Sequence, residues 1–210
     1  MDRSKKSAEE RLLRFTLRER ALHWTVALSF LYCALTGLSL WTPLLFWLAA
    51  VLGGGEAVRW GHPWGGVIFF AALSAMFRGW AREMKLDADD RLWLRNVHKY
   101  ARHEESGLPQ PGRFNAGQKT LFWLHSAAAV MLLWSGIVLW LPEAMSRGLR
   151  LAAILIHPAV AAAFIAGIIL HVYMATVATP GAFRGMIEGW VPPRWAASHH
   201  PKWYRAASKN

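Results

Sequence analysis

The sequence predicts an all-α membrane protein in which four transmembrane helices form one bundle, with both termini in the cytoplasm. Hydrophobic residues make up 54% of its 210 residues, and the charged residues are confined to blocks that separate long uncharged stretches. A helix needs ~20 mainly apolar residues to cross a bilayer, and four of the stretches are about long enough. They cover residues 21–55, 60–77, 120–142 and 151–183.

Each uncharged stretch predicts one transmembrane helix. The first stretch is longer than one crossing, and Thr42-Pro43 followed by a run of glycines indicates that its helix ends near Trp41. We therefore expect one domain over residues 1–210, with residues 81–118 as a cytoplasmic loop and residues 179–210 as a cytoplasmic tail. The expected spans cover about residues 21–41, 60–80, 119–141 and 151–178.

The basic residues are distributed asymmetrically between the connections. Of the 24 Lys and Arg residues, 21 lie before the first span, between the second and third spans (counting Arg78 and Lys119 at the span ends) or after the fourth, and 3 lie in the other two connections. The positive-inside rule therefore places both termini and the central loop in the cytoplasm. A net charge of +11 could also indicate nucleic acid binding, but the central loop carries six carboxylates as well and no recognition motif. We expect membrane lipid, and no nucleic acid, as a partner.

Two histidines share one face of the fourth predicted helix. His157 and His171 are fourteen residues apart, and fourteen steps of ~100° make nearly four full turns, with an axial displacement of roughly 21 Å. An ionisable side chain inside an apolar span is energetically expensive, so it indicates a functional role together with a partner.

The predicted topology supplies partners for both histidines. His62 opens the second span and lies at the same depth as His157, whereas His23 begins the first span and lies at the depth of His171. Two pairs from facing helices follow, one near each side of the membrane. His125, early in the third span, is an alternative to His23 as the partner of His171.

Paired imidazoles at two depths suit two six-coordinate haem irons, because the flat macrocycle fits between helices and the iron takes one axial nitrogen from each side. A closed zinc site needs four converging ligands, and the spans offer no carboxylate and one thiol, Cys33. A single cysteine also excludes an internal disulfide and covalent haem attachment. The histidines therefore predict two haems of the b type, held by their axial ligands.

Small residues near the histidines are consistent with a bulky group between the helices, or with close helix contacts alone. They are Gly37, Gly65, Gly66, Gly136 and Gly167.

The dipeptides His62-Pro63 and His157-Pro158 repeat at the same predicted depth. Because proline suits the first turn of a helix, we expect both dipeptides to mark helix starts. If the fourth helix instead begins near Leu151, Pro158 removes one backbone hydrogen bond from it.

Several segments together resemble the cytochrome b, or gamma, subunit of respiratory formate dehydrogenases over nearly the full length. The RFNAGQK block, the four histidines in order and the MIEG to HHPKWYR tail make this resemblance specific. The segments are RALHW (20–24), ALTGLSLW (34–41), GHPWGG (61–66), RFNAGQK (113–119), LIHP (155–158), ILHVYMA (169–175), GMIEGWV (185–191) and WAASHHPKWYR (195–205).

The resemblance implies four transmembrane helices and two b haems, and it removes His125 from the ligands. One haem iron would be held by His23 and His171, and the other by His62 and His157. The family pattern does not demand Pro158, and the loop over residues 85–112 matches it poorly.

The resemblance also implies a quinone site beside the cytoplasmic-side haem, lined by Asn115, Gly117 and Gln118. From the residues alone, Asn115 is expected to cap the third transmembrane helix, and Asn115 or Gln118 could donate a hydrogen bond to a quinone carbonyl.

As a whole, the resemblance implies a multi-pass subunit of a bacterial inner-membrane formate dehydrogenase complex. Electrons would pass from an iron-sulfur (beta) subunit through the two haems to quinone. Formate oxidation would belong to a separate molybdenum or tungsten (alpha) subunit, so this chain carries no catalytic residue for it. The alternatives are a diheme cytochrome b subunit of a membrane-bound hydrogenase or related quinone oxidoreductase, and a haem-free membrane anchor or small transporter.

Overall fold

The computed structural model describes residues 11–101 and 107–209, which are mostly helical. They group into two compact units. The bundle unit consists of residues 21–78 and 125–171, and the loop unit consists of the described residues before Ala21, from 79 to 124 and from 172 onwards.

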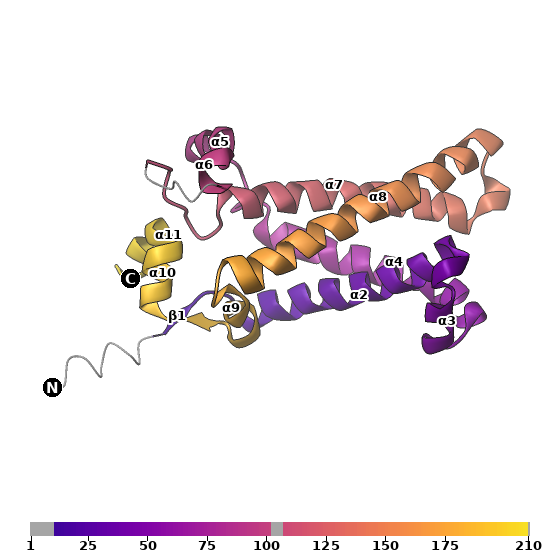
Figure 1. Ribbon diagram of the computed structural model, residues 1–210, viewed down its shortest axis with the longest axis horizontal. Helices are drawn as coiled ribbons and strands as arrows, with labels where there is room; N and C mark the ends of the chain where they lie inside the picture. The colour runs from indigo at the N-terminus through magenta and orange to yellow at the C-terminus, as the bar shows by residue number, and fades with distance from the viewer. Residues whose placement is uncertain (1–10, 102–106, 210) are drawn as a thin grey trace. The chain divides into compact units, whose positions relative to one another are not determined.

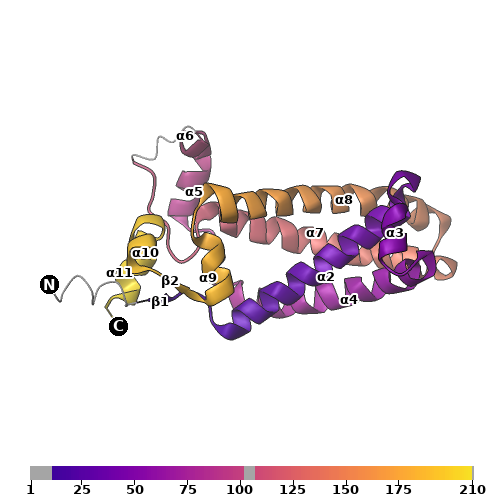
Figure 2. The same ribbon diagram turned by 60° about the horizontal axis from the view of Figure 1, so that its bottom comes forward.

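The bundle unit is built from four long helices that lie side by side in both views (Figures 1 and 2). Its core is aromatic: Phe69 and Phe164 are buried, and Phe30 stacks on Phe164 with the ring centroids 4.7 Å apart. Leu28 and Leu155, in contrast, are 62% and 72% exposed, as expected for side chains that face lipid. The helices are α2 (Leu17–Trp41), α4 (Gly55–Trp80), α7 (Ala116–Trp140) and α8 (Arg147–Tyr173).

Short helical turns connect α2 to α4 and α7 to α8. Helix α2 ends at Trp41, directly before Thr42-Pro43, and the chain then forms η1 (Pro43–Leu45) and α3 (Trp47–Val51). Gly53 and Gly54 adopt φ angles of +96° and +95°, a conformation that favours glycine, and α4 begins at the next residue. Helices α7 and α8 are joined through η2 (Pro142–Ala144).

The two His-Pro dipeptides lie inside helices and do not start them. Helix α4 begins at Gly55 and α8 at Arg147, so Pro63 and Pro158 are interior residues. The expectation that both dipeptides mark helix starts is therefore wrong, and the alternative, in which Pro158 lies inside the fourth helix, is confirmed. Each proline removes one backbone hydrogen bond, a loss that neighbouring helices can compensate in membrane proteins.

Three helical segments of the described residues are long and apolar enough to cross a membrane: α2, α7, and α8 together with the following π-helical turn η3 (Met174–Ala178). Helix α4 has 26 residues, but its continuous apolar run begins only at Val67. Glu56, Arg59 and His62 occupy its first half, which lowers its hydropathy. Its crossing of the membrane remains a prediction.

The loop unit contains short elements where the sequence led us to expect a loop and a tail. Strand β1 (Leu12–Leu13) pairs antiparallel with β2 (Trp190–Val191). Asp87 and Asp90 form a reciprocal capping box at the start of α5, and the buried Lys119 amine lies 2.5 Å from the Asp90 carboxylate. The remaining elements are α5 (Ala88–Arg95), α6 (Val97–Ala101), α9 (Ala182–Glu188), α10 (Pro193–His199) and α11 (Pro201–Ala207).

Candidate functional site

The bundle unit brings four of the predicted histidines together as two pairs. The rings of His62 on α4 and His157 on α8 have centroids 6.2 Å apart, at an interplanar angle of 72°. The rings of His23 on α2 and His171 on α8 have the same centroid separation, at an angle of 47°. Each pair joins α8 to a different helix.

This separation suits one iron atom between two imidazoles. A metal–imidazole bond is about 2.0 Å long and each centroid lies roughly 1 Å behind its nitrogen, so two axial imidazoles on one iron have centroids roughly 6 Å apart. Among the described residues, no three His, Cys, Asp or Glu side chains converge on one point. Each pair therefore has the donor set of an axially ligated haem and lacks that of a closed zinc site.

The two pairs are well separated along α8. His157 and His171 belong to one helix from Arg147 to Tyr173, so their levels differ by roughly 21 Å at the usual rise per residue. The buried core residues Phe69 and Phe164 belong to the same unit. The arrangement allows two separate metal centres in one bundle.

His125 lies against Phe164 in the bundle unit. Its ring packs edge-on against Phe164, with the centroids 4.2 Å apart, and its Nε2 atom lies 3.3 Å from the Phe164 carbonyl oxygen. The geometry thus favours His23 over His125 as the partner of His171.

Two of the predicted small residues lie directly against the histidine rings. A Cβ atom at Gly37 would lie 3.1 Å from Cε1 of His62, and one at Gly136 would lie 3.4 Å from Cε1 of His157. Gly65 has a different role, because its Cβ would meet Tyr32 and Cys33 of α2. Gly65 therefore allows close contact between α2 and α4.

Sequence reasoning missed two hydroxyl groups that bind the histidines of one pair. Thr36 Oγ1 lies 2.8 Å from Nδ1 of His62, and Ser135 Oγ lies 2.9 Å from Nδ1 of His157. A signal was present in the sequence: each hydroxyl residue immediately precedes a glycine, Gly37 or Gly136, in an apolar span.

The predicted quinone residues belong to the loop unit and cap α7. The Asn115 N–H donates to Oε1 of Gln118 at 3.0 Å, and the Gln118 N–H donates to Oδ1 of Asn115 at 2.8 Å. A Cβ at Gly117 would lie 3.4 Å from Oδ1 of Asn115. Both side-chain oxygens are therefore engaged, and the structure gives the two amide NH₂ groups no partner among the described residues.

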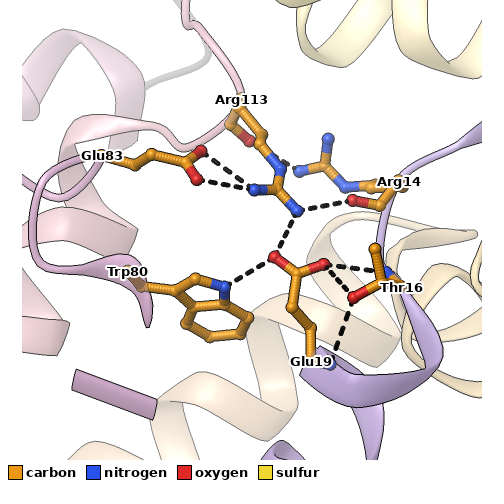
Figure 3. Close-up of polar contacts among 6 residues, drawn as sticks. All are labelled: Arg14, Thr16, Glu19, Trp80, Glu83 and Arg113. Carbon is orange, nitrogen blue, oxygen red and sulfur yellow. Dashed lines mark hydrogen bonds and ion pairs between the residues drawn. The ribbon is translucent and has the colours of Figure 1, made fainter. Parts of the chain in front are cut away.

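A charged network holds the segment that precedes Asn115 (Figure 3). Arg113 Nη2 donates to Glu19 at 2.7 Å, and Arg113 Nη1 donates to Glu83 at 2.8 Å. The Arg14 guanidinium donates to the Arg113 carbonyl at 2.9 Å, and the Arg113 guanidinium donates to the Arg14 carbonyl at 2.9 Å. Trp80 Nε1 also donates to Glu19 at 2.8 Å.

The pKa values of the two arginines respond differently to this network. Burial lowers the pKa of Arg113, but its hydrogen bonds to Glu19 and Glu83 outweigh that effect and raise it overall. Burial and the charge of Arg113 lower the pKa of Arg14 to about 9. The charge of Arg113 is thus compensated by Glu19 and Glu83, and these bonds hold the residues that lead into α7.

The C-terminal tail also contacts the segment that precedes Asn115. His200 is buried, and its ring donates from Nδ1 to the Gly112 carbonyl at 2.7 Å. Its Nε2 atom lies 2.9 Å from the Arg14 guanidinium, which can only donate. His200 is therefore neutral, with its proton on Nδ1. Sequence reasoning had assigned it no structural role.

Comparison with known proteins places the chain in a family. Residues 14–189 match the family described as prokaryotic cytochrome b561. The chain is 36% identical over 201 residues to the formate dehydrogenase cytochrome b556(fdo) subunit of Escherichia coli K12, covering 94% of each chain. It is 35% identical to the nitrate-inducible cytochrome b556(Fdn) subunit of the same strain, covering 97% of this chain and 94% of the relative. The formate dehydrogenase cytochrome b556 subunit of Haemophilus influenzae is 34% identical, with 95% and 84% covered.

Proposed function

The chain belongs to the prokaryotic cytochrome b561 family, and we propose that it is the diheme cytochrome b subunit of a formate dehydrogenase complex. In this role it anchors the complex in the bacterial inner membrane and passes electrons from an iron-sulfur subunit to quinone. Likeness over nearly the whole chain to formate dehydrogenase subunits supports this assignment over a hydrogenase subunit.

The observation that carries the proposal is the equal spacing of the two histidine pairs. Both have ring centroids 6.2 Å apart, which fits one haem iron between each pair. His62 and His157 would hold one haem, and His23 and His171 the other. When bound, each haem supplies one-electron transfer. The four histidines would fix the positions of the two haems.

The proposed topology has four membrane crossings and cytoplasmic termini. An even number of crossings returns the chain to its starting side, and the charge asymmetry of 21 basic residues against 3 supports the cytoplasm as that side. Helix α4 is the crossing with the weakest apolar signal, and its position beside α2, α7 and α8 in both views supports including it (Figures 1 and 2).

We place the quinone site at the start of α7. The oxygens of Asn115 and Gln118 are occupied by capping hydrogen bonds, so their amide NH₂ groups are the available donors to a quinone carbonyl. A Cβ at Gly117 would lie 3.4 Å from Oδ1 of Asn115, so glycine leaves space beside this carboxamide. Reduction of the quinone consumes two electrons and two protons. The surrounding basic residues favour the cytoplasmic side for this segment.

Formate oxidation belongs to a partner in this proposal. The chain has a single cysteine, so it cannot ligate an iron–sulfur cluster by cysteine thiolates. An iron-sulfur (beta) subunit would deliver the electrons, and a molybdenum or tungsten (alpha) subunit would oxidise formate.

Haem quantification on histidine variants tests the proposal. The purified complex is expected to contain two haems b per copy of this chain, with b-type bands in the reduced-minus-oxidised spectrum. His62→Ala and His157→Ala should each remove the same single haem, whereas His23→Ala and His171→Ala should each remove the other.

His125→Ala is the matched control, since this histidine also lies in the bundle but its ring packs against Phe164. It should keep both haems. Loss of a haem in His125→Ala but not in His23→Ala would refute the pairing, and a wild-type spectrum without haem b bands would refute the function itself.

A further inference from the structure

The same polar contact occurs twice in the bundle unit, at the two histidines of one pair. Thr36 on α2 contacts Nδ1 of His62 on α4, and Ser135 on α7 contacts Nδ1 of His157 on α8, at 2.8 and 2.9 Å. Both hydroxyl residues have no exposed surface. The contacts are thus shielded from water on both sides of the pair.

The direction of these hydrogen bonds follows from counting protons. Thr36 Oγ1 donates to the Tyr32 carbonyl at 2.7 Å, and Ser135 Oγ donates to the Met131 carbonyl at 2.7 Å. A carbonyl oxygen can only accept, and a hydroxyl has one proton to give. Each hydroxyl must therefore accept from the histidine, which places the histidine proton on Nδ1.

This tautomer leaves the lone pair of Nε2 available to a metal. A neutral imidazole carries one proton, so a proton held on Nδ1 of His62 and His157 frees Nε2 on both rings. Gly37 and Gly136, which directly follow the two hydroxyl residues, each leave room for the Cε1 atom of a histidine ring. Both rings are thus fixed in tautomer and in position.

The other pair lacks this support on at least one ring. The Nδ1 atom of His23 is buried and has no hydrogen-bond partner among the described residues. The two pairs therefore present different imidazoles to a metal, although their centroid separations are equal.

We propose that Thr36 and Ser135 are positioning residues that lower the reduction potential of the haem held by His62 and His157. The inference rests on the proposed haem ligation. An acceptor on Nδ1–H makes the imidazole a stronger electron donor through Nε2, and stronger axial donation favours ferric over ferrous iron.

The consequence concerns electron transfer away from the haem held by His62 and His157. With Thr36 and Ser135 in place, an electron is held less tightly between His62 and His157 than it would be without them. This favours its onward transfer to the level of His23 and His171. With both haems bound, the transfer would move one electron, and no bond or proton would change place.

Redox titration of hydroxyl variants in the purified complex tests the inference. In Thr36→Val and Ser135→Ala, the midpoint potential of one haem should shift upward, while the other haem keeps its wild-type value. Thr36→Ser keeps the hydroxyl acceptor and should keep the wild-type midpoint potential. The low-spin ferric EPR signal of the affected haem should move in the same two variants and return in Thr36→Ser.

Ser29→Ala is the matched control. Ser29 Oγ donates to the Thr25 carbonyl at 2.6 Å on the same helix as Thr36, so it has the same type of backbone bond, but it has no hydrogen bond to a histidine in the described part of the chain. It should leave both potentials unchanged.

The outcomes separate this inference from the proposed function. Two haems with unchanged potentials in both Thr36→Val and Ser135→Ala would overturn the role of the hydroxyls and leave the haem assignment intact. A downward shift would overturn it as well. A wild-type complex with fewer than two haems would overturn the proposed function together with the inference.

Discussion

At the scale of single residues, His200 connects the C-terminal tail to the segment that leads into α7. Burial first, and then the charge of Arg14, lower the pKa of His200 from 6.5 to about 3. The folded unit therefore binds the neutral ring, whereas the unfolded chain takes up a proton below pH 6.5. The stabilisation is fully present above pH 6.5 and is lost as the pH falls toward 3, by about 2 kcal/mol between pH 7 and 5.

This predicts a tail whose docking weakens in mild acid. Hydrogen–deuterium exchange, corrected for the intrinsic pH dependence, should show that α10 and α11 lose protection between pH 7 and 5. His200→Asn keeps a donor for the Gly112 carbonyl without a titrating group, so its protection should depend less on pH. His98→Ala, at an exposed position, should behave as wild type. Equal pH dependence in wild type and His200→Asn would exclude His200 as the cause.

The spacing of His157 and His171 was sufficient to predict that they share a face, because a helix has a fixed rotation per residue. The hydroxyl contacts of Thr36 and Ser135 were not predictable in the same way. They depend on the rotation of each helix about its axis relative to its neighbour, and side-chain periodicity in a uniformly apolar span does not report it.

At the scale of secondary-structure elements, α2 and α4 approach closely at Gly65. A Cβ at Gly65 would lie 2.7 Å from Cδ1 of Tyr32 and 3.0 Å from Sγ of Cys33, whereas a Cβ at the adjacent Gly66 would meet nothing within 4 Å. Gly65→Ala should therefore force the two helices apart and cost roughly 1–3 kcal/mol, as overpacking typically does.

The stability and haem content of Gly65→Ala and Gly66→Ala can be compared directly in detergent. Gly65→Ala should lower the thermal unfolding temperature and the occupancy of the haem at His62, which belongs to the same helix. Gly66→Ala adds the same methyl group one residue later and should leave both unchanged. Similar losses in the two variants would show that helix propensity or lipid contact, and not the approach to Tyr32, governs this position.

Element boundaries were predicted best where a strong helix breaker marks them. Helix α2 ends at Trp41, before Thr42-Pro43, as expected. The start of α4 at Gly55 was missed because its first turns are polar and glycine-rich, so apolar patterning gave no signal there. The same reliance on apolar patterning led us to place His62-Pro63 at a helix start when it lies inside α4.

At the scale of the whole molecule, charge distribution and histidine depth predicted the pairing of His62 with His157, and they left two helices as possible sources of the partner of His171. These are properties of long segments, and they tolerate errors of a few residues in each boundary. The internal structure of the loop unit was not predictable in this way. Its contacts join residues far apart in the chain, such as Arg14 with Arg113 and His200, through polar side chains without any periodic pattern.

The electron path through the whole molecule is expected to end at a quinone that is bound by the amide group of Asn115. Asn115→Ala would remove this donor but also the cap of α7, at a cost of about 1 kcal/mol. Asn115→Ser separates the two roles, because serine is a good cap but offers no amide donor. In both variants formate should still reduce both haems, whereas reoxidation of the haems by added quinone should slow. Stopped-flow absorbance of the haem bands in the intact complex measures both phases.

Gln118→Glu, which keeps the capping oxygen and removes the second amide donor, should also slow reoxidation. If Asn115→Ser reoxidises its haems at the wild-type rate while Asn115→Ala does not, Asn115 serves only as a helix cap and quinone binds elsewhere.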